Sequence, residues 1–148
     1  MFTQMFIMKK IFFLIVACAF GTMVFAQYHE HKHAPESVRN SYQKDYPDYK
    51  GTAWDMKNNQ WHTRYKDKDH ENRYVDVYYD KDGRRVQSRS KWDHNDLPEA
   101  VRDRMRKKYH ASDYNAYRID RPEQGIFFQL SWGNKKVYLD EHGNEVRY

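Results

Sequence analysis

The residues with the most suggestive chemistry stand near the start of the sequence, where histidines alternate with charged residues. Cleavage after Ala26 would leave Gln27 as the first residue and His29 as the third. A free amine, two deprotonated backbone amides and an imidazole surround Cu(II) or Ni(II) in the square plane that these ions prefer. We therefore predict a copper or nickel site at His29, with His31 and His33 as nearby ligands. Two alternatives remain open: a mobile tail without function, and cyclisation of Gln27, which would remove the amine.

The rest of the sequence lacks the patterns of known catalytic sites. It contains no Ser-His-Asp spacing, phosphate-binding loop or metalloprotease helix motif. The two Asp-x-x-Gly stretches at Asp80 and Asp140 lack the further ligands of a calcium loop, and a hairpin turn explains them better. The remaining histidines stand singly: His62, His70, His94, His110 and His142. We therefore predict a protein that is not an enzyme and carries no other cofactor.

Residues 1–26 have the pattern of a secretory signal peptide. Lys9 and Lys10 form a basic start, residues 11–20 are apolar, and Ala26 ends a small-residue cleavage site. The apolar run is shorter than a membrane span needs, so we expect removal and a periplasmic or secreted protein without a membrane anchor. A lipoprotein with lipid on Cys18 is the alternative, but the apolar run before that residue is short.

The composition of the mature chain indicates one small folded domain with an unusual core. Removing 26 of the 148 residues leaves 122, which is enough for one domain, and removes Cys18, the single cysteine. The nearly balanced charge excludes a dedicated nucleic-acid binder. The whole chain holds 13 Tyr and 4 Trp, whereas aliphatic residues are scarce. The core must therefore use aromatic rings, and buried Tyr hydroxyls need hydrogen-bond partners.

After a His-rich tail at residues 27–34, one pattern occurs twice, in residues 35–91 and 97–148. Each copy has an apolar stripe of helical period, followed by stretches that alternate every two residues and end in an Asp-x-x-Gly turn. The turns are 60 residues apart, and the prolines before the two helices are 63 apart. The sequence therefore predicts an α+β fold of two tandem repeats, each one helix packed on a four-stranded antiparallel sheet.

These motifs carry a family resemblance. A helix opened by proline, the pair Tyr46-Pro47, Trp54 in the next strand and a Tyr-rich strand before Asp-x-x-Gly resemble the β-lactamase-inhibitor-like, PepSY-like periplasmic proteins of Bacteroidetes-type bacteria. The resemblance covers residues 35–148, and the second copy departs from it at His110. It implies a secreted non-enzymatic domain whose exposed sheet face binds something. It does not imply β-lactamase inhibition, since the inhibitor's contact residues have no counterparts that can be placed here.

The sheet face turned away from the helices is the predicted binding surface. Alternate strand residues point to opposite faces, so packing Val77, Tyr79 and Val137 under the helices leaves many Tyr and Arg side chains outside. Those two residue types are enriched at protein interfaces. The predicted partner-binding residues are His62, Arg64, Lys66, Tyr74, Asp76, Tyr78, Arg85, Arg89, Phe127, Gln129, Lys136 and Tyr138. Arg118 is expected on the same face, and Val86 on the other.

The predicted partner is a periplasmic or secreted protein or peptide that is acidic or tolerates aromatic contacts. A small-ligand or metal-handling protein is the alternative function. A face that is simply solvated and binds nothing is also open, because antiparallel sheets often leave one face in water. A broad shallow face would favour a protein partner, and a deep pocket a small ligand. Between the copies, Trp92 is expected to lie in the seam.

Overall fold

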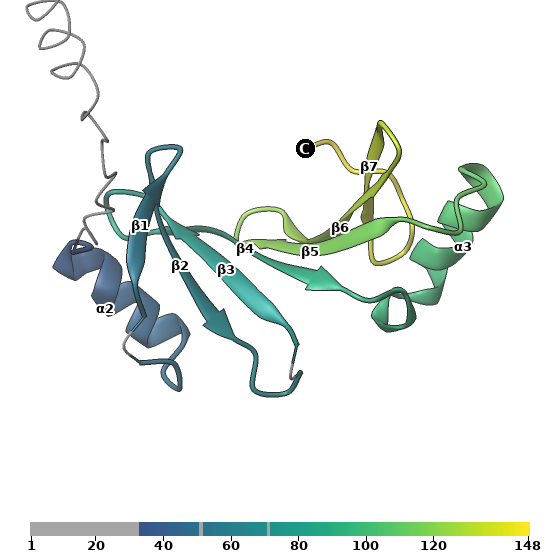
Figure 1. Ribbon diagram of the computed structural model, residues 1–148. Helices are drawn as coiled ribbons and strands as arrows, with labels where there is room; N and C mark the ends of the chain where they lie inside the picture. The colour runs from purple at the N-terminus through teal and green to yellow at the C-terminus, as the bar shows by residue number, and fades with distance from the viewer. Residues whose placement is uncertain (1–32, 51, 71) are drawn as a thin grey trace, which may run out of the picture. The chain divides into compact units, whose positions relative to one another are not determined.

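The computed structural model describes residues 33–50, 52–70 and 72–148 (Figure 1). The predicted signal peptide at residues 1–26, and most of the His-rich tail with His29 and His31, lie outside the described residues. The described elements are α2 (Glu36–Asp45), β1 (Trp54–Lys57), β2 (Gln60–Lys66), β3 (Tyr74–Tyr79), β4 (Arg85–Trp92), the 3-10 turn η1 (His94–Asp96), α3 (Glu99–Lys108), β5 (Asn115–Arg121), β6 (Gly125–Trp132) and β7 (Lys135–Asp140).

The strands form one antiparallel sheet of seven strands in sequence order. The predicted α+β class is confirmed, but the prediction of two four-stranded sheets is wrong in two respects. First, β4 pairs with β5, so the hydrogen-bond ladder runs through without a break. Second, the chain after β7 forms only an isolated bridge between Leu139 and Glu145. Beyond that bridge the chain leaves the ladder, and the Tyr148 ring stacks on Tyr138.

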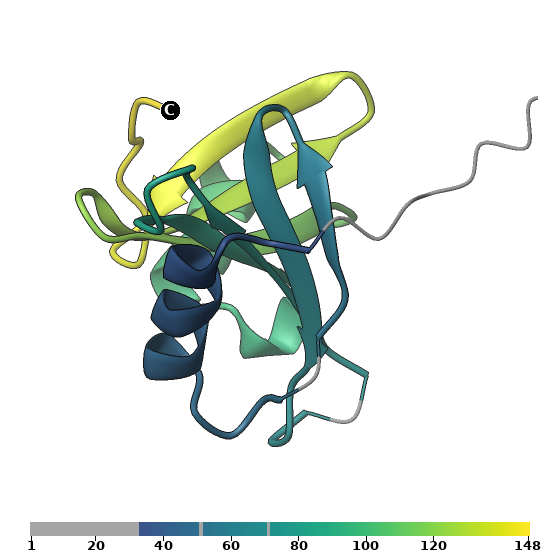
Figure 2. The same cartoon turned by 90° about the vertical axis from the view of Figure 1, so that its left-hand side faces the viewer.

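Both helices pack against the same face of the sheet. Cross-strand partners in a sheet point to the same side. Val75 lies opposite Ser90, Ser90 opposite Arg118, Arg118 opposite Phe128, and Phe128 opposite Leu139. Val75 packs on the core under α2, and Phe128 and Leu139 belong to the core under α3. Figure 2, seen from the α2 end, shows the two helices on one side of the strands.

The two cores differ in composition. Under α2, the buried side chains are mainly aromatic: Ala34, Val38, Tyr42, Trp54, Trp61, Val77 and Tyr79. Under α3, they are mainly aliphatic: Leu97, Val101, Met105, Ala111, Ala116, Phe128, Leu130 and Leu139. The predicted burial of Val77 and Tyr79 is confirmed, whereas Val137 is only half-buried.

The two Asp-x-x-Gly turns have the same local structure. The Asp80 carboxylate accepts hydrogen bonds from the backbone N–H groups of Asp82 and Arg84, and Asp140 accepts them from His142 and Asn144. The glycine that follows has φ of +85° at Gly83 and +78° at Gly143, a conformation that side chains with a Cβ resist. Each glycine lies against the first turn of its helix, with no room for a Cβ.

Candidate binding face

The sheet face turned away from both helices, here called the open face, is the candidate functional surface. No helix of the described residues covers it, since the core packing of both helices lies on the other side. In the register of the sheet it carries Asp55, Lys57, His62, Arg64, Lys66, Tyr74, Asp76, Tyr78, Gln87, Arg89, Lys91, Tyr117, Ile119, Arg121, Phe127, Gln129, Ser131, Lys136, Tyr138 and Asp140. All the predicted partner-binding residues except Arg85 therefore share this face.

The placement of Arg85 on the open face is wrong because a β-bulge changes the register. Tyr78 lies opposite Gln87, but Tyr79 lies opposite Arg85, so Val86 is the extra residue. Arg85 consequently points to the helix side. There its Nη1 donates to the Tyr46 hydroxyl at 3.4 Å and lies 3.5 Å from Asp120. Val86, expected under the helix, occupies the bulge instead.

The placement of Arg118 on the open face is also wrong. Arg118 lies opposite Ser90 and Phe128 on the helix side, and its guanidinium carbon is 5.9 Å from the Trp92 ring centroid. The same alternation places Tyr117, Ile119 and Arg121 on the open face. Sequence reasoning missed these three residues because its phase along β5 was displaced by one residue.

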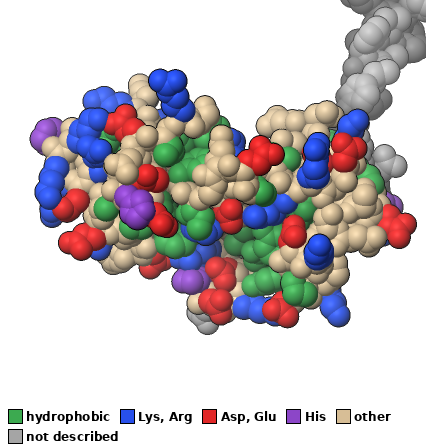
Figure 3. Space-filling model, turned by 180° about the vertical axis from the view of Figure 1, so that it is seen from behind, with side chains coloured by type: hydrophobic (Ala, Val, Ile, Leu, Met, Phe, Trp, Pro, Cys, Tyr) green, Lys and Arg blue, Asp and Glu red, His purple; other side chains and the backbone are tan. Residues whose placement is uncertain are grey.

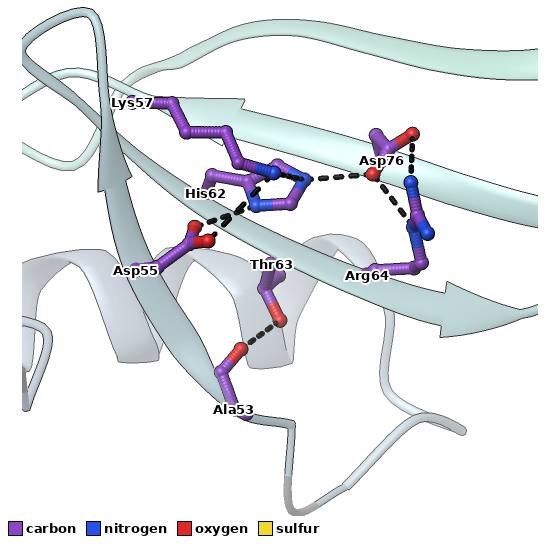
Figure 4. Close-up of polar contacts among 7 residues, drawn as sticks. All are labelled: Ala53, Asp55, Lys57, His62, Thr63, Arg64 and Asp76. Atoms are coloured by element: carbon purple, nitrogen blue, oxygen red, sulfur yellow. Dashed lines mark hydrogen bonds and ion pairs between the residues drawn. The ribbon is translucent and has the colours of Figure 1, made fainter. Parts of the chain in front are cut away.

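A buried histidine organises the first half of the open face (Figure 4). His62 is 5% exposed, its Nδ1 lies 2.6 Å from Asp55 Oδ1, and its Nε2 lies 2.7 Å from Asp76 Oδ1. The imidazole therefore lies between two carboxylates, with the Lys57 ammonium also 3.5 Å from Nε2, and these contacts hold the ring in place. The His62 ring also packs against Tyr78, with centroids 4.9 Å apart. His62 is therefore a support of the face rather than an exposed contact.

Asp76 links that histidine to Arg64. Arg64 Nε donates to Asp76 Oδ1 at 2.8 Å and its Nη2 to Oδ2 at 3.1 Å, a bidentate pair. Burial alone would raise the pKa of Asp76, but the hydrogen bonds from His62 and Arg64 outweigh it and lower the pKa to about 2. Asp76 is therefore ionised at neutral pH and already satisfied by partners within the chain.

The second half of the open face is an aromatic cluster. Ile119 and Phe127 are buried although they lie on this face. The Tyr138 and Tyr148 rings stack 4.3 Å apart with 5° between their planes, and Phe127 meets both rings edge-on. Tyr148 is 56% exposed. Tyr74, at the opposite side of the face, is 52% exposed. Tyr78 and Tyr138 lie on the face predicted for them, but both are half-buried.

The hollows of the described residues lie away from the centre of the open face. The largest of those found, about 650 Å³, lies beside the start of the open face, at Tyr49 and Lys66. Another of about 590 Å³ lies at the edge of that face and has Arg121 in its wall. Neither has Tyr78, Arg89 or Tyr138 in its wall. In Figure 3, hydrophobic side chains form patches interleaved with charged ones. The centre of the open face, whose residues Tyr78, Arg89 and Tyr138 line neither of these hollows, suits a protein partner better than a small ligand.

The predicted copper or nickel site stays a prediction. His29 and His31 lie outside the described residues, and His33 is exposed. Within residues 33–50, 52–70 and 72–148, no three His, Cys, Asp or Glu side chains are grouped to hold a metal ion. No helix in this described part of the chain is long and apolar enough to cross a membrane.

Solved structures share this arrangement of helices and sheet. A BLIP-like protein from Bacteroides fragilis has a TM-score of 0.68 at 18% identity, covering 80% of this chain and 86% of that one. A candidate periplasmic protein from Bacteroides eggerthii and a DUF2874 family protein from Bacteroides uniformis each have a TM-score of 0.66 at 18% identity, covering 78% of this chain and 88% of theirs. No family model and no curated protein matches the chain.

These similarities define the fold as BLIP-like. At such identities they establish the architecture alone, so the predicted resemblance to β-lactamase-inhibitor-like proteins is confirmed at the level of fold. The PepSY-like part of that resemblance stays a prediction.

Proposed function

We propose that the chain is a non-enzymatic periplasmic module that binds a protein or peptide through the open face. The observation that carries the proposal is the composition of that face: a seven-stranded sheet, uncovered by helices, whose surface carries tyrosines and arginines. A sheet face without a function is typically wet and rich in Lys and Glu, whereas Tyr and Arg dominate the energetics of interfaces. The candidate periplasmic protein with the same fold supports the location.

Rigidity of the surface also supports a binding role. Many open-face side chains are already fixed by neighbours: His62 and Arg64 by Asp76, and Tyr138 by Tyr148. A partner that binds side chains held in this way loses little conformational entropy in ordering them.

A photo-crosslinking residue tests the proposed face. We would place it at Tyr74, which is 52% exposed on the open face, and separately at Met56, which is 40% exposed but points to the helix side. The mature chain, incubated with secreted and periplasmic protein of the organism that encodes it, should give a discrete crosslinked product from position 74 alone. Equal products from both positions, or a product from position 56 only, would contradict the proposal.

Truncation of Tyr78 measures the contribution of the face to the complex. Tyr78→Ala is expected to weaken binding of the crosslinked partner by about 1–2 kcal/mol, roughly tenfold, as for an interface anchor. Because Tyr78 packs on His62, the unfolding midpoint of the variant must be measured alongside. Met56→Ala is the matched control and should bind like the wild type.

A further inference from the structure

The centre of the open face holds an arginine that is fixed in place and has no acidic partner. Arg89 lies in β4, the fourth of the seven strands. Its guanidinium carbon is 3.9 Å from the centroid of the Tyr117 ring, so the planar group stacks on that ring. Stacking holds the guanidinium in one orientation before any partner arrives. Interface anchors are commonly such central arginines.

The acid nearest to Arg89 in the sheet is already engaged. Asp76 lies directly opposite Arg89 on β3, but its two oxygens accept hydrogen bonds from His62 and Arg64. Among the described residues, no carboxylate lies within 4.0 Å of Arg89, and its Nε is buried without a hydrogen-bond partner. The charge of Arg89 is therefore not neutralised by an ion pair within this part of the chain.

Arg121 is a second arginine of the same kind. Its guanidinium stacks on Tyr148, 4.1 Å from the ring centroid. Its nitrogens donate to the amide oxygens of Gln87, at 3.2 Å, and Gln124, at 3.0 Å. These acceptors are neutral, so they orient the guanidinium and leave its charge available.

The surroundings of the two arginines favour an anion. Burial raises the pKa of Tyr78 and of Tyr138, so both hydroxyls keep their protons at neutral pH and remain hydrogen-bond donors. Over the whole open face, cationic side chains outnumber acidic ones. The cations are Lys57, Arg64, Lys66, Arg89, Lys91, Arg121 and Lys136, and the acids are Asp55, Asp76 and Asp140.

From this arrangement we propose that the open face recognises an acidic protein segment in extended conformation, with Arg89 and Arg121 each binding one carboxylate. Arg89 lies opposite Ile119, so Arg121 is its diagonal neighbour on the next strand, at a backbone separation of about 7–8 Å. In an extended segment, side chains two residues apart share a face and are about 6.6–6.8 Å apart. The Arg89 guanidinium lies on Tyr117, which is on the other side of Ile119 from Arg121, so the two charged groups are farther apart than the two backbones. Acidic residues that share one face of the segment at a wider spacing, such as i and i+4, therefore match the two arginines. This inference rests on the proposed function, since it names the partner chemistry of the same face.

Poly-L-glutamate is a suitable probe, because charge repulsion keeps it extended at neutral pH. The mature chain should bind it at low salt, and the side-chain Nε–H signal of Arg89 should shift on titration followed by NMR. Arg89→Gln and Arg121→Gln should each bind about fivefold to tenfold more weakly, and the double variant more weakly still, as expected for loss of charge-assisted pairs. Arg39→Gln removes the same charge from an exposed position on α2 and should bind almost like the wild type.

Three results would overturn the inference: no binding to the wild type, equal losses in Arg39→Gln and Arg89→Gln, or shifts confined to residues away from the open face. Amide spectra of each variant must match the wild type, and Arg89→Lys supplies a second test. It keeps the charge but loses the planar stack, so its affinity should fall between those of the wild type and Arg89→Gln. The Tyr74 crosslink is independent of these results. Crosslinking at Tyr74 without poly-glutamate binding would leave the proposed function intact and reject only the acidic segment.

Discussion

The two halves of the sheet carry the same kind of helix on different core chemistry. Under α2, aromatic rings pack edge-on, as between Tyr42 and Trp54, with centroids 5.4 Å apart. The fully buried Tyr79 donates its hydroxyl hydrogen to Asp45 at 2.8 Å. The Tyr42 hydroxyl, by contrast, is buried without a hydrogen-bond partner among the described residues. Under α3, Leu130, Leu139 and Met105 fill the space without polar atoms. The comparison shows that the helix-on-sheet geometry tolerates either chemistry, but the aromatic core has to accommodate buried hydroxyls, and of Tyr42 and Tyr79 only Tyr79 finds an acceptor.

On the open face the aromatic side chains gather in the second half of the sheet, whereas in the core they gather in the first half. The first half carries a network of charges around His62, and the second half an aromatic cluster around Phe127. Arg89 and Arg121 lie between these regions, on the two strands that join the halves. A partner that spans both regions would meet ionic contacts on one side and aromatic contacts on the other, which would fix its direction along the sheet.

The largest effect is expected from a cavity in the aliphatic core. Leu130 is fully buried, and Leu130→Ala should lower the free energy of unfolding by about 2–5 kcal/mol, because it loses apolar burial and leaves a void. Urea unfolding of the mature chain measures this change. The control is Ile126→Ala on the same strand, where the side chain is 37% exposed and the loss should stay below about 1 kcal/mol. Similar losses at both positions would refute the tight packing assigned to this half.

Two glycine variants test whether the contact between the Asp-x-x-Gly turn and the helix stabilises both halves to the same extent. A Cβ on Gly83 would lie 2.8 Å from the Ser37 carbonyl oxygen, and one on Gly143 would lie 2.7 Å from that of Ala100. Both substitutions also strain a positive φ. Gly83→Ala and Gly143→Ala should each cost about 2–3 kcal/mol, of which about 1–2 is strain in φ.

Gly125→Ala is the matched control for these variants. Its φ is +78°, but a Cβ there would meet nothing within 4 Å, so only the strain in φ should remain, about 1–2 kcal/mol. Thermal unfolding of all three variants separates the two contributions. If Gly125→Ala proved as damaging as the other two, contact of the turns with the helices would not be the cause.

The sequence was informative where a local pattern has one structural solution. The Asp-x-x-Gly pattern predicted both turns, and apolar residues repeated at every fourth position predicted both helices. Both patterns depend only on residues close together in the sequence. The pairing of β4 with β5 could not be predicted from the sequence. It depends on contacts between the two halves, whereas the alternation of apolar and polar residues shows only that each segment is a strand. The bulge at Val86 placed Arg85 on the other face for a similar reason: an extra residue reverses the alternation of the residues before it relative to those after it, and nothing in the composition indicates this.

The Trp92 side chain tests the contact between the halves. Its ring packs on Phe128 of β6 at 5.6 Å between centroids, and the guanidinium of Arg73, from the loop before β3, lies 4.6 Å from its centroid. It therefore touches both halves, as expected for a residue in their seam. Trp92→Ala should lower the free energy of unfolding by about 2 kcal/mol through lost apolar burial. A variant that melts at the wild-type temperature would rule out this role.

The smallest predicted effect, and the most specific, is the dependence of stability on acid. The pKa of Asp76 is about 2 in the folded chain, against 3.8 as its ordinary value. Because the pKa of Asp76 is lower in the folded chain than in the unfolded chain, its ionised carboxylate stabilises the fold. This stabilisation is fully present above about pH 4 and is lost as the pH falls towards 2. Over that window the wild type should lose of order 1–2 kcal/mol through this residue. Asp76→Asn removes this contribution at every pH, so its stability should fall less steeply with acid.

The control is Asp48→Asn, at a carboxylate whose side chain is 74% exposed; its acid slope should match that of the wild type. Unfolding in urea at a series of pH values measures all three slopes. Equal slopes for Asp76→Asn and the wild type would mean that the His62–Asp76–Arg64 network does not hold this carboxylate ionised. The first half of the open face would then lack the ionic character that distinguishes it from the aromatic second half, and a partner would have no ionic contact there to fix its direction.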